Sequence, residues 1–109
     1  MSADPGDRSF ADWVVERLEP LGGVRARRMF GGWGLYQRDT FFGIVHRGRL
    51  YLKTDDATRS RYESRGCSRF QATERQTLRR YWEVPGDVLE DPDALLEWSA
   101  EATRAARGG

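Results

Sequence analysis

Few residues of this 109-residue chain could support catalysis or bind a metal ion. His46 is its only histidine and Cys67 its only cysteine, and neither has a second histidine or cysteine at metal-binding spacing. A Ser-His-Asp triad needs a histidine beside a nucleophile, whereas His46 falls in a segment that predicts a β-strand. We therefore predict no catalytic residue, no metal site and no cofactor, and we interpret Cys67 as a structural or incidental thiol.

Two clusters of carboxylates are better explained by helix capping than by acid–base chemistry. Each cluster comes where a helix is predicted to begin: Asp55-Asp56 in one case, and Glu90-Asp91 with Asp93 in the other. Aspartate is a preferred N-cap because its side chain accepts hydrogen bonds from the first free backbone N–H groups. We interpret both clusters as caps rather than as general acids or bases.

The remaining chemistry is recognition of an anion by cations placed among aromatic rings. The aromatic residues on or beside predicted strands are Trp33, Tyr36, Tyr51, Tyr81 and Trp82. The cations on the same segments are Arg25, Arg27, Arg47, Arg49, Lys53, Arg79 and Arg80. A sheet face of this kind binds single-stranded nucleic acid by stacking and phosphate contact, and we expect the cations to share one exposed face. The alternative is that most of the aromatic rings form the core.

The charges are segregated along the chain, although the formal net charge is only +1. Residues 1–20 hold five acids and two bases, residues 21–82 fourteen bases and five acids, and residues 83–109 seven acids and two bases. The central segment favours an anionic partner; the alternative is a solvated basic sheet neutralised by acidic terminal helices. A lone cysteine and the lack of an apolar run of membrane-spanning length favour a cytoplasmic protein that contacts no membrane.

A glycine-rich run is the element that must shape this sheet: Met29-Phe30-Gly31-Gly32-Trp33-Gly34. Glycine accepts positive φ and lets another backbone approach closely, so the run predicts a bulge or turn with at least one positive φ. Trp33 is then expected at a loop tip, as the first candidate for a partner-binding anchor; its alternative is burial under a helix. In strict alternation the Arg28 side chain points into the core with Val24 and Ala26. Because a lone buried charge is costly, either a bulge directs this side chain to solvent or a carboxylate pairs with it.

The sequence pattern predicts helices and strands along the rest of the chain. Ser9 and Asp12 resemble a capping box for a helix over residues 8–19, and Asp55 or Asp56 begins a helix that runs to Arg65. Predicted strands cover residues 24–30, 35–37, 41–45, 50–53, 70–73 and 80–84, with hairpin turns at residues 38–39, 47–48 and 74–76. A last helix begins at Asp91-Pro92. The pattern predicts one α+β domain over residues 1–109, with its core at residues 8–107 and helices packed on an antiparallel sheet in the order α-β-β-β(-β)-α-β-β-α.

In five short motifs the chain resembles the TfoX/Sxy N-terminal domain family. The motifs are Met29-Phe30-Gly31-Gly32, Gly34-Leu35-Tyr36, Phe42-Gly43, Leu50-Tyr51-Leu52-Lys53 and Tyr81-Trp82-Glu83-Val84-Pro85. They occur in the expected order, and the match runs from about Phe10 to Ala106. The resemblance implies a small α+β domain associated with natural competence, the uptake of DNA by bacteria. Full-length competence regulators carry a second, helical C-terminal domain, and we expect this chain to be a stand-alone member without one.

The resemblance and the missing catalytic residues together favour a non-enzymatic regulatory or adaptor domain. We expect a protein partner, with the transcription machinery as one candidate and a second copy of the chain as another. A nucleic-acid-binding module that uses the arginine-rich sheet is the alternative function. An enzyme or small-ligand binder would require a pocket with convergent polar groups.

Overall fold

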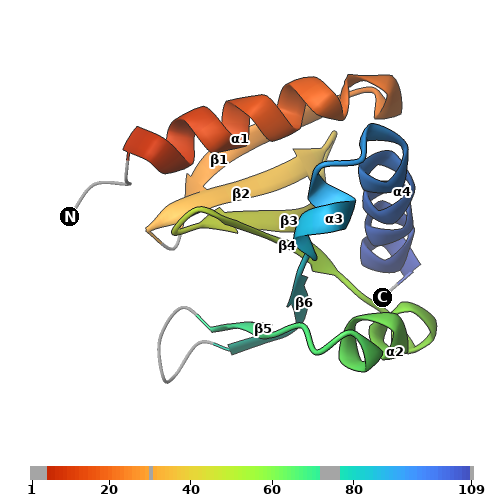
Figure 1. The fold of residues 1–109 in the computed structure, drawn as a ribbon. Helices are drawn as coiled ribbons and strands as arrows, with labels where there is room; N and C mark the ends of the chain where they lie inside the picture. Colours follow the sequence, from red (N-terminus) through yellow and green to blue (C-terminus); the bar gives the residue numbers. More distant parts are fainter. Residues whose placement is uncertain (1–4, 30, 72–76, 109) are drawn as a thin grey trace.

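The computed structural model describes residues 5–29, 31–71 and 77–108, and six strands form one antiparallel sheet (Figure 1). The strands are β1 (Val24–Met29), β2 (Gly32–Gln37), β3 (Thr40–His46), β4 (Arg49–Lys53), β5 (Arg69–Gln71) and β6 (Thr77–Glu83), in the order β1-β2-β3-β4-β6-β5. Arg38, Arg47 and Gly48 have positive φ in the two tight turns of the meander, as short hairpin loops require. Those two predicted turns are confirmed, whereas the third, at residues 74–76, lies outside the described residues.

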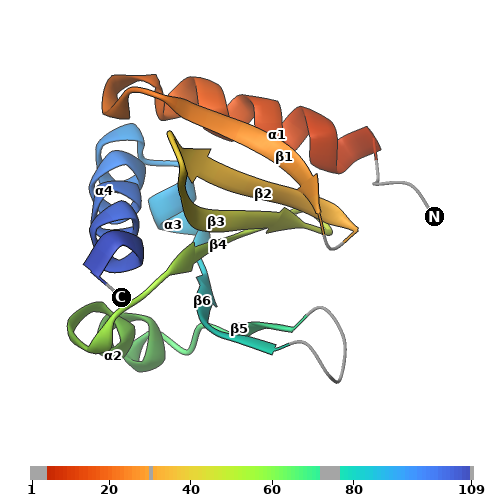
Figure 2. The same ribbon diagram turned by 180° about the vertical axis from the view of Figure 1, so that it is seen from behind.

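Four α-helices and one 3₁₀ turn complete the predicted α+β fold. They are α1 (Pro5–Arg17), the 3₁₀ turn η1 (Glu19–Leu21), α2 (Asp56–Ser64), α3 (Gly86–Leu89) and α4 (Pro92–Gly108). Helix α1 lies along β1 and β2, while α4 packs on β3 and β4 and α2 packs beside β6 (Figure 1). In the view from behind, β1, β2 and β3 lie in front of α3 (Figure 2).

Side-chain caps begin two of these helices where the sequence predicts them. Asp55 accepts a hydrogen bond from the Thr58 N–H at 2.9 Å and forms a capping box with it, and Asp91 accepts from the Asp93 and Ala94 N–H groups. The predicted capping box at Ser9 is wrong, because α1 already begins at Pro5, a residue well suited to a helix N-terminus.

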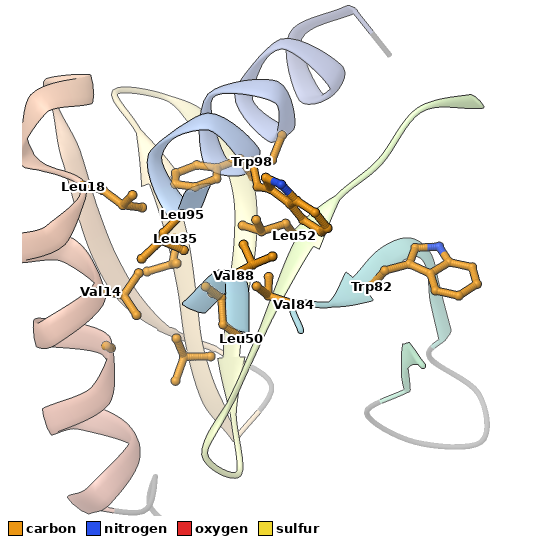
Figure 3. Close-up of a cluster of buried hydrophobic side chains, with 14 of the residues drawn as sticks. Val14, Leu18, Leu35, Leu50, Leu52, Trp82, Val84, Val88, Leu95 and Trp98 are labelled. Carbon is orange, nitrogen blue, oxygen red and sulfur yellow. The ribbon is translucent and has the colours of Figure 1, made fainter. Parts of the chain in front are cut away.

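The first core lies between the helices and one face of the sheet, here called the helix-covered face. Val14 and Leu18 from α1 and Leu95 from α4 are fully buried there. They pack against strand residues that include Leu35, Leu50 and Leu52 (Figure 3). This aliphatic layer holds α1 and α4 on the sheet.

A second, smaller core lies on the opposite face, here called the helix-free face. Its buried members are Ile44, Phe70 and Tyr81, and the partly buried residues packed on them are Phe41, Tyr51 and Leu78. All six come from strands, so within the described residues no helix contributes to this core. The sheet therefore presents side chains on this face that no helix layer covers.

A β-bulge decides which side chains reach each face. The β2–β3 register shifts between Leu35, which pairs with Gly43, and Tyr36, which pairs with Phe41. Phe42 is the extra residue, and it is fully buried in the first core, whereas Phe41 packs in the second. Phe41 and Phe42 thus point to opposite faces of the sheet. Beyond the bulge, the alternation of side chains along β3 is shifted by one residue.

Asp7 ties α1 to the turn between β3 and β4. Its carboxylate accepts hydrogen bonds from the Arg47 N–H at 2.8 Å and the Gly48 N–H at 2.7 Å, and the side chain is 2% exposed. Backbone N–H groups in a positive-φ turn have no ladder partner, so this carboxylate satisfies donors that would otherwise be unpaired. The sequence offers no local signal for this long-range contact.

Candidate partner-binding face

The glycine run shapes the edge of the helix-free face. Gly31 has φ +73° in the turn between β1 and β2, which confirms the predicted turn, while Phe30 lies outside the described residues. Gly32 and Gly34 are strand residues instead. A Cβ on Gly32 would lie 2.3 Å from the carbonyl oxygen of Val45, and one on Gly34 would lie 2.0 Å from the sulfur of Met29. The strand glycines therefore allow close approach of neighbouring atoms.

Three aromatic rings cross the helix-free face in a line, here called the aromatic row: Tyr36, Phe41 and Tyr81. The ring centroids of Tyr36 and Phe41 are 5.2 Å apart, and those of Phe41 and Tyr81 are 5.1 Å apart. A Cβ on Gly34 would meet the Phe41 ring at 3.1 Å, so this glycine leaves room for the row. Tyr36 and Phe41 are partly exposed and Tyr81 is buried. The row presents aromatic surface at one end and is anchored in the second core at the other.

Cations lie over both ends of the aromatic row. The guanidinium carbons of Arg25 and Arg27 are 5.3 and 5.6 Å from the Tyr36 ring centroid. The Nζ of Lys53 is 5.3 Å from the Tyr81 ring centroid. These distances fall in the cation–π range, and the charged groups of Arg25 and Arg27 remain exposed. Together these side chains form the cation-flanked row: Arg25, Arg27, Tyr36, Phe41, Lys53 and Tyr81.

Desolvation acts on both titratable groups at the inner end of the row. Burial lowers the pKa of the Lys53 amine, and the positive charge of Arg80 lowers it further. Burial likewise raises the pKa of the Tyr81 hydroxyl, and Tyr36 adds to this effect. Lys53 is thus partly shielded from water beside the Tyr81 ring.

The other predicted cations do not all join this row. Arg49 lies on the same face, but its Nη1 is 3.1 Å from a carboxylate oxygen of Glu83. Arg47 occupies the turn between β3 and β4. The expectation that Arg80 shares this face is wrong, because Arg80 lines hollows beside α2 and α4 on the opposite side. The side chain of Arg79 lies outside the described residues.

The comparison with known protein families decides the identity of the fold. Residues 16–106 match the model of the TfoX N-terminal domain. The chain belongs to this family. The TfoX N-terminal domain described here is 34% identical over 92 residues to a protein of Aliivibrio fischeri named DNA transformation protein TfoX1. That alignment covers 83% of this chain and 44% of the relative.

A second relative is an uncharacterized 12.7 kDa protein from the trpE 5′ region of Spirochaeta aurantia. It is 38% identical over 58 residues, which cover 53% of this chain and 50% of the relative. The TfoX N-terminal domain therefore spans about half the length of these two relatives.

Trp33 of this TfoX N-terminal domain does not occupy a loop tip, so that expectation is wrong. It lies in β2, pairs with Arg28 and Val45, and packs partly buried against the first core. Its indole nitrogen is buried and has no hydrogen-bond partner within the part of the chain that the structure describes. Arg28, opposite Trp33 on the edge strand, is exposed, so neither a bulge nor a buried carboxylate is needed to explain it. A role for Trp33 as an anchor stays a prediction.

The residues with catalytic potential lie on separate elements. His46 ends β3 and packs edge-on against the Phe70 ring, with the ring centroids 5.3 Å apart. Cys67 follows α2, packs against the first core, and has a pKa raised by burial. Among residues 5–29, 31–71 and 77–108, no three His, Cys, Asp or Glu side chains converge as metal ligands would. The helices within these ranges are too short or too polar to cross a membrane.

Sequence reasoning missed the position of Phe41 in the aromatic row and the contact of Asp7 with the turn between β3 and β4. Phe41 forms the middle of the aromatic row, and only the pairing of β2 with β3 turns it to that face. A possible signal for Phe41 was the double phenylalanine after a tight turn, which does not fit simple alternation in a strand.

Proposed function

We propose that this TfoX N-terminal domain is a non-enzymatic regulatory domain of DNA transformation that binds a protein partner through the cation-flanked row. The name of the Aliivibrio fischeri relative, DNA transformation protein TfoX1, supports a role in DNA transformation. Family membership supports a shared role for the domain. The single observation that carries the binding surface is the row itself, because it combines exposed arginines with partly exposed aromatic rings on a face without a helix layer.

The composition of the row suits protein recognition. Tyrosine and arginine are enriched among the residues that carry most of the binding energy at protein interfaces. The rings are held by strand pairing and by contacts with each other, so little side-chain entropy is lost when a partner binds. A partner that presents an acidic segment with an apolar side chain would match Arg25 and Arg27 on either side of Tyr36.

Transformation frequency in the native host provides the functional test. The double variant Arg25→Gln with Arg27→Gln removes the exposed charges, and Tyr36→Ala removes the exposed end of the aromatic row. The matched control is Arg8→Gln with Arg17→Gln, which removes two charges from α1. We expect at least a tenfold loss for the first two variants at normal protein abundance and no change for the control. Equal frequencies in all strains would contradict the proposal.

Site-directed photo-crosslinking identifies the partner. A photoreactive phenylalanine analogue is placed at position 36, with position 8 on α1 as the control. A protein captured only from position 36, with nuclease present, supports a protein partner, and its mass distinguishes a second copy of the chain from a component of the transcription machinery. If nuclease treatment abolishes capture at position 36, the proposal of a protein partner is wrong.

Single-stranded nucleic acid is the second candidate for the same face, because bases stack on aromatic rings while arginines contact phosphates. Fluorescence anisotropy with a labelled oligonucleotide checks it at low salt, where electrostatic attraction is strongest. If this candidate is right, losing one phosphate-contacting arginine, Arg25 or Arg27, lowers the slope of log affinity against log salt by about 0.7. Undetectable binding at low salt would eliminate it.

A further inference from the structure

A hollow of about 570 Å³ lies where α2 meets β5 and β6, and it shares no residue with the cation-flanked row. It is lined by Arg59 and Glu63 from α2, by Arg69 from β5, and by Arg80 and Trp82 from β6. Its volume falls in the range of small-molecule sites, roughly 300–1,000 Å³. We call it the arginine hollow. An adjoining hollow shares Arg80 and is bordered by the end of α4.

Two of the three arginines in this hollow have no carboxylate partner among the described residues. Arg59 is neutralised by its own helix, since its guanidinium lies 3.0 Å from Asp56 and 3.8 Å from Glu63. Arg69 and Arg80 are exposed and form no ion pair with any residue that the structure describes. An anion that enters the hollow therefore meets two guanidinium groups that do not have to leave an acid first.

The backbone holds Arg69 and Arg80 in place for such contact. The β5–β6 register jumps from Arg69 opposite Trp82 to Phe70 opposite Leu78, so Arg80 lies within the extra residues of β6. Bulges of this kind redirect side chains at sheet edges. The carbonyl of Arg80 accepts hydrogen bonds from the Thr54 N–H at 2.6 Å and the Thr54 hydroxyl at 3.0 Å. The backbone position from which the Arg80 side chain extends is thus anchored to the end of β4.

Trp82 lines the arginine hollow with its aromatic ring. Trp82 lies on β6 and belongs to the first core, where its ring centroid is 6.4 Å from that of Tyr62 (Figure 3). The guanidinium carbon of Arg69 is 6.0 Å from the Trp82 ring centroid. The Trp82 indole N–H is buried and has no hydrogen-bond partner among the described residues. Because this N–H is shielded from solvent, it is the ring of Trp82 that lines the hollow.

We propose that the arginine hollow binds an organic phosphate of nucleotide size, with Arg69 and Arg80 holding the phosphates beside the Trp82 ring. Two guanidinium groups give the bidentate hydrogen bonds that phosphate oxygens accept best. A planar base attached to the phosphates can stack on an arginine plane or on the indole. The site is separate from the cation-flanked row and stands whether or not that row binds a protein. The phosphate could belong to a free nucleotide or to the end of a nucleic acid strand.

Titration monitored by the indole N–H signals in ¹⁵N-correlated NMR spectra tests this proposal. The chain has four tryptophans, and Trp82→Phe assigns the signal of interest. The probes are ADP, inorganic pyrophosphate, and a single-stranded tetranucleotide with and without a 5′-phosphate. The variants are Arg69→Gln and Arg80→Gln, with the single variants Arg8→Gln and Arg17→Gln on α1 as charge-matched controls. The same spectra show whether each variant is folded.

We expect ADP to shift the Trp82 indole signal saturably, and Arg69→Gln or Arg80→Gln to weaken binding at least tenfold while the controls bind as the unmodified chain does. Tighter binding of ADP than of pyrophosphate supports the contact with a base. Binding of the 5′-phosphorylated tetranucleotide alone assigns the phosphate to a strand end and overturns a free nucleotide. The proposal is overturned if no probe gives a saturable shift at low salt, or if Arg80→Gln binds ADP unchanged.

Discussion

The two faces of the sheet solve the same packing problem with different side chains. On the helix-covered face, Leu35, Leu50 and Leu52 are at most 1% exposed beneath α1 and α4. On the helix-free face, Tyr36 and Phe41 are only partly covered, and exposed arginines lie over the Tyr36 ring. Leucines of β2 and β4, together with Phe42, are buried beneath the helices, whereas aromatic rings with long cationic side chains lie on the other face.

The difference shows how a small domain could keep the proposed binding surface without losing its fold. The aliphatic stems of arginine and lysine cover aromatic rings while their charged groups stay in water. Such a cover is thinner than a helix layer and can be displaced by a partner without unfolding the sheet. The helix-covered face therefore holds the larger buried core, and the helix-free face keeps side chains that solvent reaches.

The largest difference between the faces is expected at the consecutive phenylalanines. Phe42→Ala opens a cavity under the helices and should destabilise the fold by about 3–5 kcal/mol. Phe41→Ala removes a partly exposed ring, so we expect a cost of about 1–2 kcal/mol together with loss of partner binding. Urea unfolding of both variants measures this difference. Equal losses of stability would mean that the two faces do not differ as the structure indicates.

Glycine substitutions probe how tightly the helix-free face is built. A Cβ on Gly32 would clash with the carbonyl oxygen of Val45, which cannot move independently, so Gly32→Ala should cost about 2–4 kcal/mol. Gly34→Ala meets mainly the end of the Met29 side chain, which can rotate away, and should cost about 1 kcal/mol. Gly86→Ala faces open space and is the control, with an expected change below about 0.5 kcal/mol. A neutral Gly32→Ala would argue against close strand approach.

The contact between α1 and the sheet gives a further comparison. Asp7→Ala leaves the Arg47 and Gly48 N–H groups without their acceptor, and we expect a loss of about 1–3 kcal/mol in thermal or urea unfolding. Asp12→Ala, an exposed position on the same helix, is the control and should change stability by less than about 0.5 kcal/mol. If both variants lower the free energy of unfolding equally, the composition of the helix, rather than the contact with the turn, is responsible.

The smallest expected effect is a pH dependence carried by His46. Burial lowers the pKa of this imidazole below 6.5, Arg47 lowers it further, and Asp7 opposes the shift. The folded state therefore favours the neutral ring, and stability should fall slightly as the pH drops from about 6.5 through the folded pKa. Proton NMR titration of this single histidine, folded and in urea, measures both pKa values. A folded pKa at or above the unfolded one contradicts the prediction, and His46→Gln should remove this pH dependence.

Elements set by local rules could be predicted from the sequence. The turn at Arg38-Asp39, the capping box at Asp55 and the helix start at Asp91-Pro92 depend on φ preferences and hydrogen bonds within a few residues. The start of α1 was missed because a helix can begin one turn earlier at Pro5, whose fixed φ suits the first helical position. The short α3 was missed because the Pro85-Gly86 pair is equally typical of a plain turn.

The sequence by itself therefore determined the α+β class, the hairpin turns, two helix caps and membership in the TfoX N-terminal domain family. Tertiary structure alone decided that Phe41 joins the aromatic row, that Trp33 packs toward the helices, and that Arg80 faces the arginine hollow. The physical reason is that bulges in β3 and β6 shift the alternation of side chains. A bulge forms only when two strands pair in a particular register, and that register depends on contacts between distant residues.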